Sequence, residues 1–150
     1  MKILVVEDNV DDAMLLGVAL RRKGLCQPVA VLGSAERAME YLLGHGLYAD
    51  RKTYPLPELI LLDWRLPRME GGEFLKWLRC QPAFRLMPVT VMCGSNTNCE
   101  AEKAYQLGAN SWFGKPHTIE ELTEMVQVIH NFWQKCQLPR CETIQPSVRL

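Results

Sequence analysis

Four charged residues in this chain each follow a short apolar run, at the point where that run ends. Glu7 and Asp8 follow the first run. Asp63 follows a central run, and Lys115 follows one nearer the C-terminus. Clustered carboxylate oxygens suit Mg²⁺, and a neighbouring lysine can hold an anion. A divalent cation, a lysine and a free carboxylate together are suited to phosphoryl transfer, in which the carboxylate attacks in line.

Each of these residues also has an ordinary interpretation when it is taken alone. Asp63 can cap a turn, and Lys115 can be a solvated surface lysine. Glu7 and Asp8 can be surface carboxylates at the start of a helix. Their joint placement favours chemistry, because the carboxyl ends of parallel strands share one edge of a sheet and ligands bind there.

Strands and helices alternate along the predicted fold. Apolar runs without polar alternation are typical of strands buried on both faces of a parallel sheet. Such runs predict strands at 3–6, 28–32, 59–63, 89–93 and 110–113. Capping residues and helical spacing predict the intervening helices, which begin after Asn9, Ser34, Gly72, Thr97 and Thr118. This strict alternation predicts an α/β fold, a doubly wound five-stranded parallel sheet with helices on both faces.

Length and composition are those of a single soluble domain. The 150 residues are 48% hydrophobic and 23% charged, and 17 basic residues balance 17 acidic ones. This balance argues against a nucleic-acid or membrane-surface binder, and no run is long enough to span a membrane. The six cysteines form no CxxC pair, so we expect a reducing cytosol and mostly buried thiols.

The chain resembles the receiver domain of two-component response regulators. The resemblance rests on VEDN at 6–9, LLD at 61–63, LPRMEG at 66–71 and KP at 115–116, in this order. It covers about residues 1–136, leaving 137–150 as a C-terminal extension without a domain of its own. It implies the flavodoxin-like strand order 2-1-3-4-5.

Several features resemble one subgroup of this family, the stand-alone regulators that partner phytochrome-type histidine kinases. They are the long loop at 45–57, the stretch at 105–111, and the pair Phe132 and Trp133. The resemblance implies a histidine kinase, possibly of the phytochrome type, as the partner of this chain.

The resemblance also implies roles for the acidic residues. Asp63 would accept a phosphoryl group from a phosphohistidine. Asp8 and Asp63 would bind Mg²⁺ through their side chains, and Arg65 would bind it through its backbone carbonyl. Glu7 would act through a metal-bound water.

The resemblance also implies that Lys115 would pair with the phosphoryl group and that the peptide bond before Pro116 would be cis.

Two residues depart from the family pattern. Cys93 stands where Thr or Ser usually binds the phosphoryl group, although Ser95 could substitute, and a thiol is a weak donor. Trp112 stands where a smaller aromatic residue usually switches rotamer. We therefore expect phosphorylation with a weakened or altered conformational response.

The leading hypothesis is a stand-alone cytoplasmic phosphoacceptor that signals by protein contact and does not turn over an outside substrate. The broad apolar stripe of the last helix, including Phe132 and Trp133, predicts a homodimer. The alternative is a receiver-like binding or dimerisation module that works without phosphorylation. A flavodoxin-like cofactor enzyme is disfavoured, because the stretch at 7–12 is acidic where such enzymes cradle phosphate.

Overall fold

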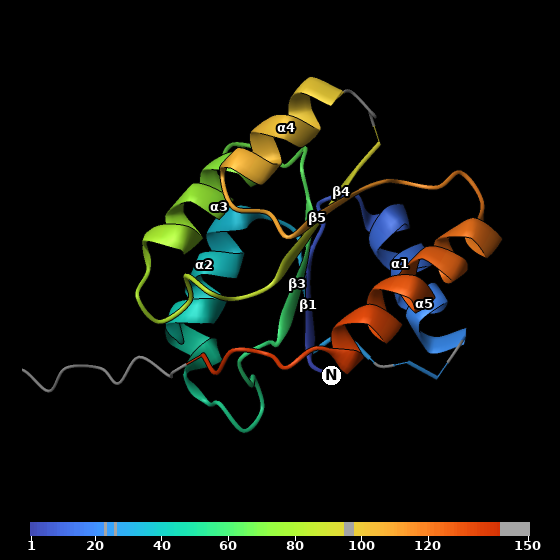
Figure 1. Ribbon diagram of the computed structural model, residues 1–150. Helices are drawn as coiled ribbons and strands as arrows, with labels where there is room; N and C mark the ends of the chain where they lie inside the picture. The colour runs from blue at the N-terminus through green and yellow to red at the C-terminus, as the bar shows by residue number, and fades with distance from the viewer. Residues whose placement is uncertain (23, 26, 95–97, 142–150) are drawn as a thin grey trace, which may run out of the picture.

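A parallel five-stranded sheet forms the centre of the molecule, with helices on both faces (Figure 1). The computed structural model describes residues 1–22, 24–25, 27–94 and 98–141. The strands are β1 (Ile3–Val6), β2 (Ala30–Leu32), β3 (Leu59–Asp63), β4 (Val89–Cys93) and β5 (Ser111–Gly114). The helices are α1 (Val10–Arg22), α2 (Ala35–Leu43), α3 (Gly71–Cys80), α4 (Asn98–Gln106) and α5 (Ile119–Lys135), with a short 3-10 helix η1 (Gly46–Ala49). The strand order is β2-β1-β3-β4-β5, which confirms the expected flavodoxin-like order.

The three central strands, β1, β3 and β4, are buried because both faces of the sheet are covered. Helices α1 and α5 lie on one face, and α2, α3 and α4 lie on the other (Figure 1). In β3, Ile60 and Leu62 join the core on the α2–α3 side, whereas Leu59 and Leu61 join the core on the α1–α5 side. Alternate side chains of a strand point to opposite faces, so a strand covered on both faces needs apolar residues at every position.

Polar side chains fix the starts of several helices, as the sequence predicted. Asn9 Oδ1 accepts a hydrogen bond from the backbone N–H of Asp12 at 2.9 Å. Ser34 caps α2 and Thr118 caps α5 in the same way. Thr97, the predicted cap of α4, lies outside the described residues.

The long connection after α2 is ordered by one arginine. Arg51 donates hydrogen bonds to the carbonyl oxygens of Tyr41 at 2.8 Å and Leu42 at 2.7 Å. These carbonyls belong to the last turn of α2, where no backbone N–H further along the helix can donate to them. The Tyr41 hydroxyl donates to the carbonyl of Pro55 at 2.8 Å, so the loop is held against α2 at two points.

The chain after α5 crosses the end of the sheet at which the strands begin (Figure 1). Its last described residue, Cys141, packs against the core on the α2–α3 side. Burial raises the pKa of the Cys141 thiol, and the nearby charge of Arg79 partly opposes this. Residues 137–141 therefore lie against the body of the domain.

No helix within the described ranges is long and apolar enough to cross a membrane. The expectation of mostly buried thiols is wrong for the described cysteines, among which only Cys93 is buried. Cys80 and Cys99 lie on solvent-facing sides of α3 and α4, and Cys26 lies outside the described residues.

Helix α3 begins in very close contact with the end of β3. A Cβ added at Gly71 would lie 2.7 Å from the carbonyl oxygen of Asp63 and 3.0 Å from Trp64 Cα. Both neighbours are backbone atoms, which cannot move away as a flexible side chain can. Glycine at this position therefore allows the helix to start directly beside Asp63.

We expect Gly71→Ala to lower the free energy of unfolding by about 1–3 kcal/mol, because the added methyl group overpacks a rigid contact. Urea unfolding followed by circular dichroism measures this. Gly33→Ala is the matched control, since a Cβ there meets nothing within 4 Å. Equal unfolding midpoints for the two variants would contradict the prediction.

Candidate functional site

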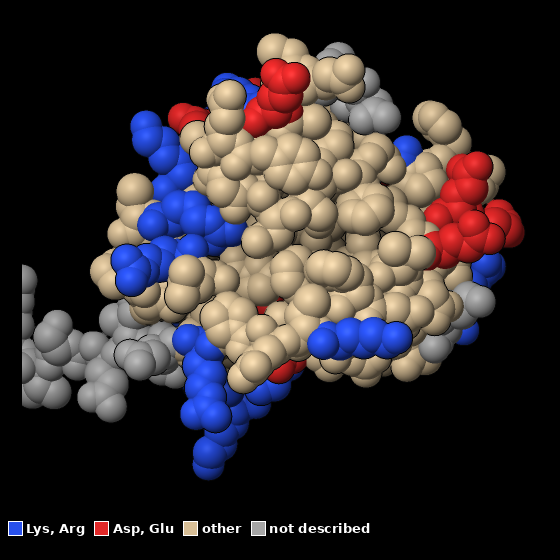
Figure 2. Space-filling view, viewed as in Figure 1, with Lys and Arg blue, Asp and Glu red and all other residues tan. Residues whose placement is uncertain are grey.

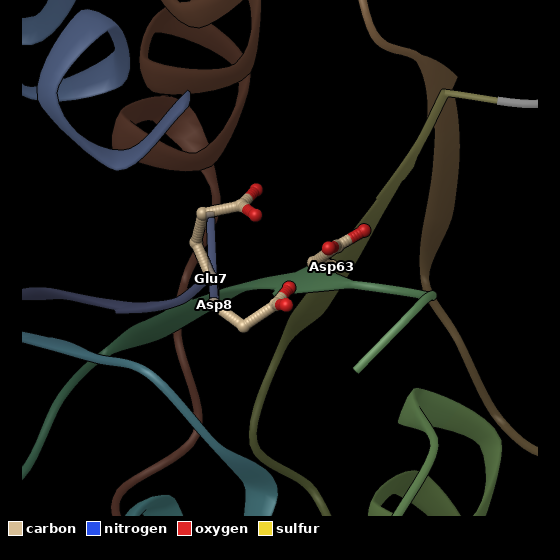
Figure 3. A group of neighbouring side chains, drawn as sticks. All are labelled: Glu7, Asp8 and Asp63. Atoms are coloured by element: carbon tan, nitrogen blue, oxygen red, sulfur yellow. The ribbon is translucent and has the colours of Figure 1, made fainter. Parts of the chain in front are cut away.

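Three carboxylates meet at the carboxyl ends of two neighbouring strands (Figure 3). Glu7 and Asp8 follow β1, and Asp63 ends β3. These strands pair in parallel, with Val6 opposite Leu62. The residues that follow, Glu7 and Asp63, therefore lie next to each other at the ends of the two strands. One oxygen atom from each of the three carboxylates lies within 4.8 Å of the others. Glu7 and Asp63 are buried, whereas Asp8 is exposed.

Lys115 reaches these carboxylates from the segment after β5. Its Nζ atom donates a hydrogen bond to Glu7 Oε2 at 2.6 Å and to Asp12 Oδ2 at 3.0 Å. It also lies 3.4 Å from Asp63 Oδ2. The backbone N–H of Lys115 donates to the carbonyl of Cys93 at 2.8 Å, which fixes the lysine backbone beside the end of β4.

Burial and charge work against each other at this site. Burial raises the pKa of Glu7 to about 7, with the charge of Asp63 adding to the effect and the Lys115 hydrogen bond opposing it. Burial likewise raises the pKa of Asp63 despite the nearby lysine charge. Burial lowers the pKa of Lys115, but its hydrogen bonds to Glu7 and Asp12 outweigh this, and the net pKa is raised. The lysine is therefore charged at neutral pH.

Backbone donors orient the two buried carboxylates. The N–H of Asn9 donates to Glu7 Oε1 at 3.1 Å, and the N–H of Arg65 donates to Asp63 Oδ1 at 3.3 Å. The Arg65 side chain extends away from the site and forms an ion pair with Glu100 on α4. The segment after β3 is thus linked to the first turn of α4.

The two residues that depart from the expected pattern lie close to this edge. Cys93 is fully buried at the end of β4. Trp112 is half-buried in β5, and its ring meets that of Trp64 edge-on, with centroids 5.5 Å apart. The backbone N–H of Trp112 donates to the Tyr105 hydroxyl at 3.1 Å. Ser95, the suggested substitute for a strand-end hydroxyl, lies outside the described residues.

The predicted cis peptide bond before Pro116 is wrong for this structure, because the described residues contain no cis peptide bond. The trans form is the more stable isomer of an X–Pro bond, by about 0.5–1 kcal/mol. Lys115 reaches Glu7 and Asp63 with the trans bond in place.

Asp12 is a member of the site that the sequence analysis did not identify. The sequence analysis included it only in the acidic stretch at 7–12, and acidic residues are common at the start of a helix. A signal was present, because Asp12 lies four residues before Leu16 and eight before Leu20, both buried. This spacing places Asp12 on the inward stripe of α1, whereas Asp11 aligns with the exposed Leu15.

The donor set fits a hard divalent cation. Glu7, Asp8 and Asp63 offer oxygen atoms alone, which suits Mg²⁺ better than softer metals. A single lysine cannot neutralise these carboxylates, and crowded like charges raise the pKa of each other. The residues at this edge are therefore compatible with the Mg²⁺ site that the resemblance implied.

Comparison with known proteins identifies relatives along most of the chain. The family model described as response regulator receiver domain matches residues 3–127. Response regulator Rcp1 from Synechocystis sp. is 32% identical over 131 residues, which cover 87% of this chain and 87% of Rcp1.

Solved structures give the same assignment. The phosphorylated cyanobacterial phytochrome response regulator RcpA matches with a TM-score of 0.82 and 32% identity, over 92% of this chain and 97% of that one. The Mn²⁺-bound form of response regulator Rcp1 matches with a TM-score of 0.78 and 32% identity, over 91% and 97% of the two chains. A matching family model, relatives in sequence and a shared strand order together show that this chain belongs to the response regulator receiver domain family.

Proposed function

We propose that this chain is a response regulator of a two-component system and that Asp63 accepts a phosphoryl group from a histidine kinase. The observation that carries the proposal is the position of Asp63. It is a buried carboxylate at a strand end, with a lysine ammonium 3.4 Å away and two further carboxylates beside it. The phosphorylated state of the similar RcpA supports this reaction.

In the proposed reaction, a carboxylate oxygen of Asp63 attacks phosphorus. The new oxygen–phosphorus bond forms as the bond between phosphorus and the donor nitrogen of phosphohistidine breaks, and that nitrogen keeps the electron pair. Lys115 offsets negative charge on the phosphoryl oxygens during the transfer. The result is an acyl phosphate on the protein itself, so no outside substrate is turned over.

Mg²⁺ is the proposed cofactor, held by the side chains of Asp8 and Asp63, by the backbone carbonyl of Arg65, and by Glu7 through a water. When bound, it would neutralise phosphoryl oxygens. The donor chemistry of the three carboxylates and the Mn²⁺-bound form of Rcp1 support a divalent cation here.

A phytochrome-type histidine kinase is the proposed partner, because RcpA is a phytochrome response regulator. The chain matches 97% of RcpA and 87% of Rcp1, both of which are response regulators, and we propose that it likewise signals by protein contact, in the cytoplasm. Balanced charge, with 17 basic and 17 acidic residues, supports an output that needs neither nucleic acid nor a membrane surface.

The second candidate function is a receiver-like module that works without phosphorylation. Cys93 favours it, because a buried thiol at the end of β4 is a poor donor to a phosphoryl group. Trp112 favours it as well, since its ring already packs against Trp64. A phosphorylation experiment separates the two candidates.

We expect incubation with acetyl phosphate and Mg²⁺ to add one phosphoryl group to the wild-type chain, measured as intact mass. Asp63→Asn removes the attacking carboxylate with little change of shape, so the adduct should disappear. Asp11→Asn is the matched control, because Asp11 is an exposed carboxylate on α1. It should retain the adduct.

Omitting Mg²⁺ should reduce the adduct strongly. The absence of any adduct in folded, Mg²⁺-binding wild type would favour the phosphorylation-independent module. An adduct that persists in Asp63→Asn would place the acceptor elsewhere.

Mg²⁺ affinity should fall as pH falls. A proton and a cation compete for Glu7, whose pKa is raised to about 7 by burial, so lowering the pH from 8 to 6 protonates it. We expect a loss in affinity of up to about tenfold over this range, measured by isothermal titration calorimetry. Glu7→Gln should flatten the dependence, and a wild-type affinity that does not change between pH 6 and 8 would count against the assignment.

We also propose a homodimer formed through α5. Figure 2, viewed over α4, β5 and α5, shows mostly uncharged surface at the centre and charged side chains toward the edges. Phe132 on α5 is 60% exposed, and Val128 one turn earlier is also exposed. Paired exposed apolar residues on one helix face support an association site.

Phe132→Glu should shift the protein from dimer to monomer in sedimentation velocity runs over a range of concentrations, because a charge would be buried at the interface. Leu47→Glu is the control, since Leu47 is an exposed apolar residue on η1. A wild type that stays monomeric at the highest concentration would refute the dimer.

A further inference from the structure

The ammonium group of Lys115 is shared among three carboxylates, and Asp63 is the most distant of them. The distances from Nζ are 2.6 Å to Glu7, 3.0 Å to Asp12 and 3.4 Å to Asp63. An ammonium group has three N–H donors, so three acceptors saturate it. The lysine is thus held mainly by the two carboxylates that are not the proposed phosphoacceptor.

Asp12 differs from the other two partners of this lysine. Its side chain is 43% exposed, against 1% for Glu7 and 5% for Asp63. It is also absent from the group of three carboxylates whose oxygens lie within 4.8 Å of one another. Its carboxylate accepts a hydrogen bond from the lysine, so its role at this edge is exerted through Lys115.

The carboxylate of Asp12 is presented by a rigid element. The backbone N–H of Asp12 is bonded to the capping side chain of Asn9, and Leu16 and Leu20 anchor α1 in the core. A cavity of about 70 Å³ adjoins both Asp12 and Lys115, between α1 and the segment that leads into α5. This volume would hold about two waters, so solvent can reach the ion pair of Asp12 with Lys115.

We propose that Asp12 is a positioning residue that competes with Asp63 for the ammonium group of Lys115 until an incoming phosphoryl group replaces it. The proposal rests on the proposed function of Asp63. A phosphoryl group carries nearly two negative charges and three strong acceptor oxygens, so it outcompetes a single solvated carboxylate for the ammonium group. Asp12 therefore lowers the rate of phosphoryl transfer, and the size of this effect depends on the strength of its ion pair with Lys115.

The test compares initial rates of adduct formation with acetyl phosphate and Mg²⁺, followed by intact mass. In this reaction the oxygen–phosphorus bond to Asp63 forms as the bond from phosphorus to acetate breaks, and acetate leaves with the electron pair. Asp12→Asn keeps the shape of the side chain and removes its charge. We expect the rate to rise by about two- to fivefold, the range that a partly exposed ion pair supports.

Two comparisons separate positioning from other effects. Asp11→Asn removes one charge from the same turn of α1 at an exposed residue, and its rate should match that of wild type. In a Lys115→Ala background, Asp12→Asn should change the slower residual rate by less than it does in wild type, because its effect passes through the lysine. Urea unfolding midpoints of all variants check that the fold is retained.

Each outcome decides the proposal. Acceleration by Asp12→Asn that depends on Lys115 supports it. Equal acceleration with and without Lys115, or with Asp11→Asn, shows plain charge repulsion of the donor and overturns it. An adduct in wild type with no change in Asp12→Asn overturns the positioning role alone, whereas no adduct in wild type removes the reaction and overturns both proposals.

Discussion

The burial of like-charged carboxylates at the ends of two adjacent parallel strands is the constraint on which this molecule depends. The pairing of β1 with β3 brings Glu7 and Asp63 to the same level, and burial raises the pKa of both. Lys115 follows β5, on the far side of β4 from β3, and its ammonium group offsets part of the negative charge of Glu7 and Asp63. Elements that begin at this edge must fit around the charged group, as the close approach of Gly71 to Asp63 illustrates.

Much of this arrangement could be predicted from local sequence. An unbroken apolar run identifies a strand covered on both faces, and the run at 59–63 corresponds to β3 to the residue. A polar residue that directly follows such a run must lie at the strand end, which places Asp63 correctly. Helix starts were predictable at Asn9, Ser34 and Thr118, because capping depends on side chains within three residues of one another.

Other features depend on contacts between distant segments, and sequence patterns alone do not determine them. The ion pair of Asp12 with Lys115 joins residues 103 positions apart, so no local pattern around Asp12 identifies its partner. The connection after α2 read as a plain loop, because nothing nearby shows that Arg51 bonds to the end of α2. The cis bond before Pro116 was expected by resemblance, and the chain reaches the same lysine contacts in the trans form.

The segment at 137–141 has a consequence for how rigidity is distributed. It leaves α5 on one side of the sheet and brings Cys141 to the core on the other side, near Arg79 at the end of α3. The two helical layers are therefore tied together around the edge at which the strands begin (Figure 1). The carboxylates lie at the opposite edge, at the carboxyl ends of β1 and β3 (Figure 3). The chain therefore joins the two helical layers at the edge opposite the charged group, so this contact lies far from the carboxylates and acts on the stability of the domain.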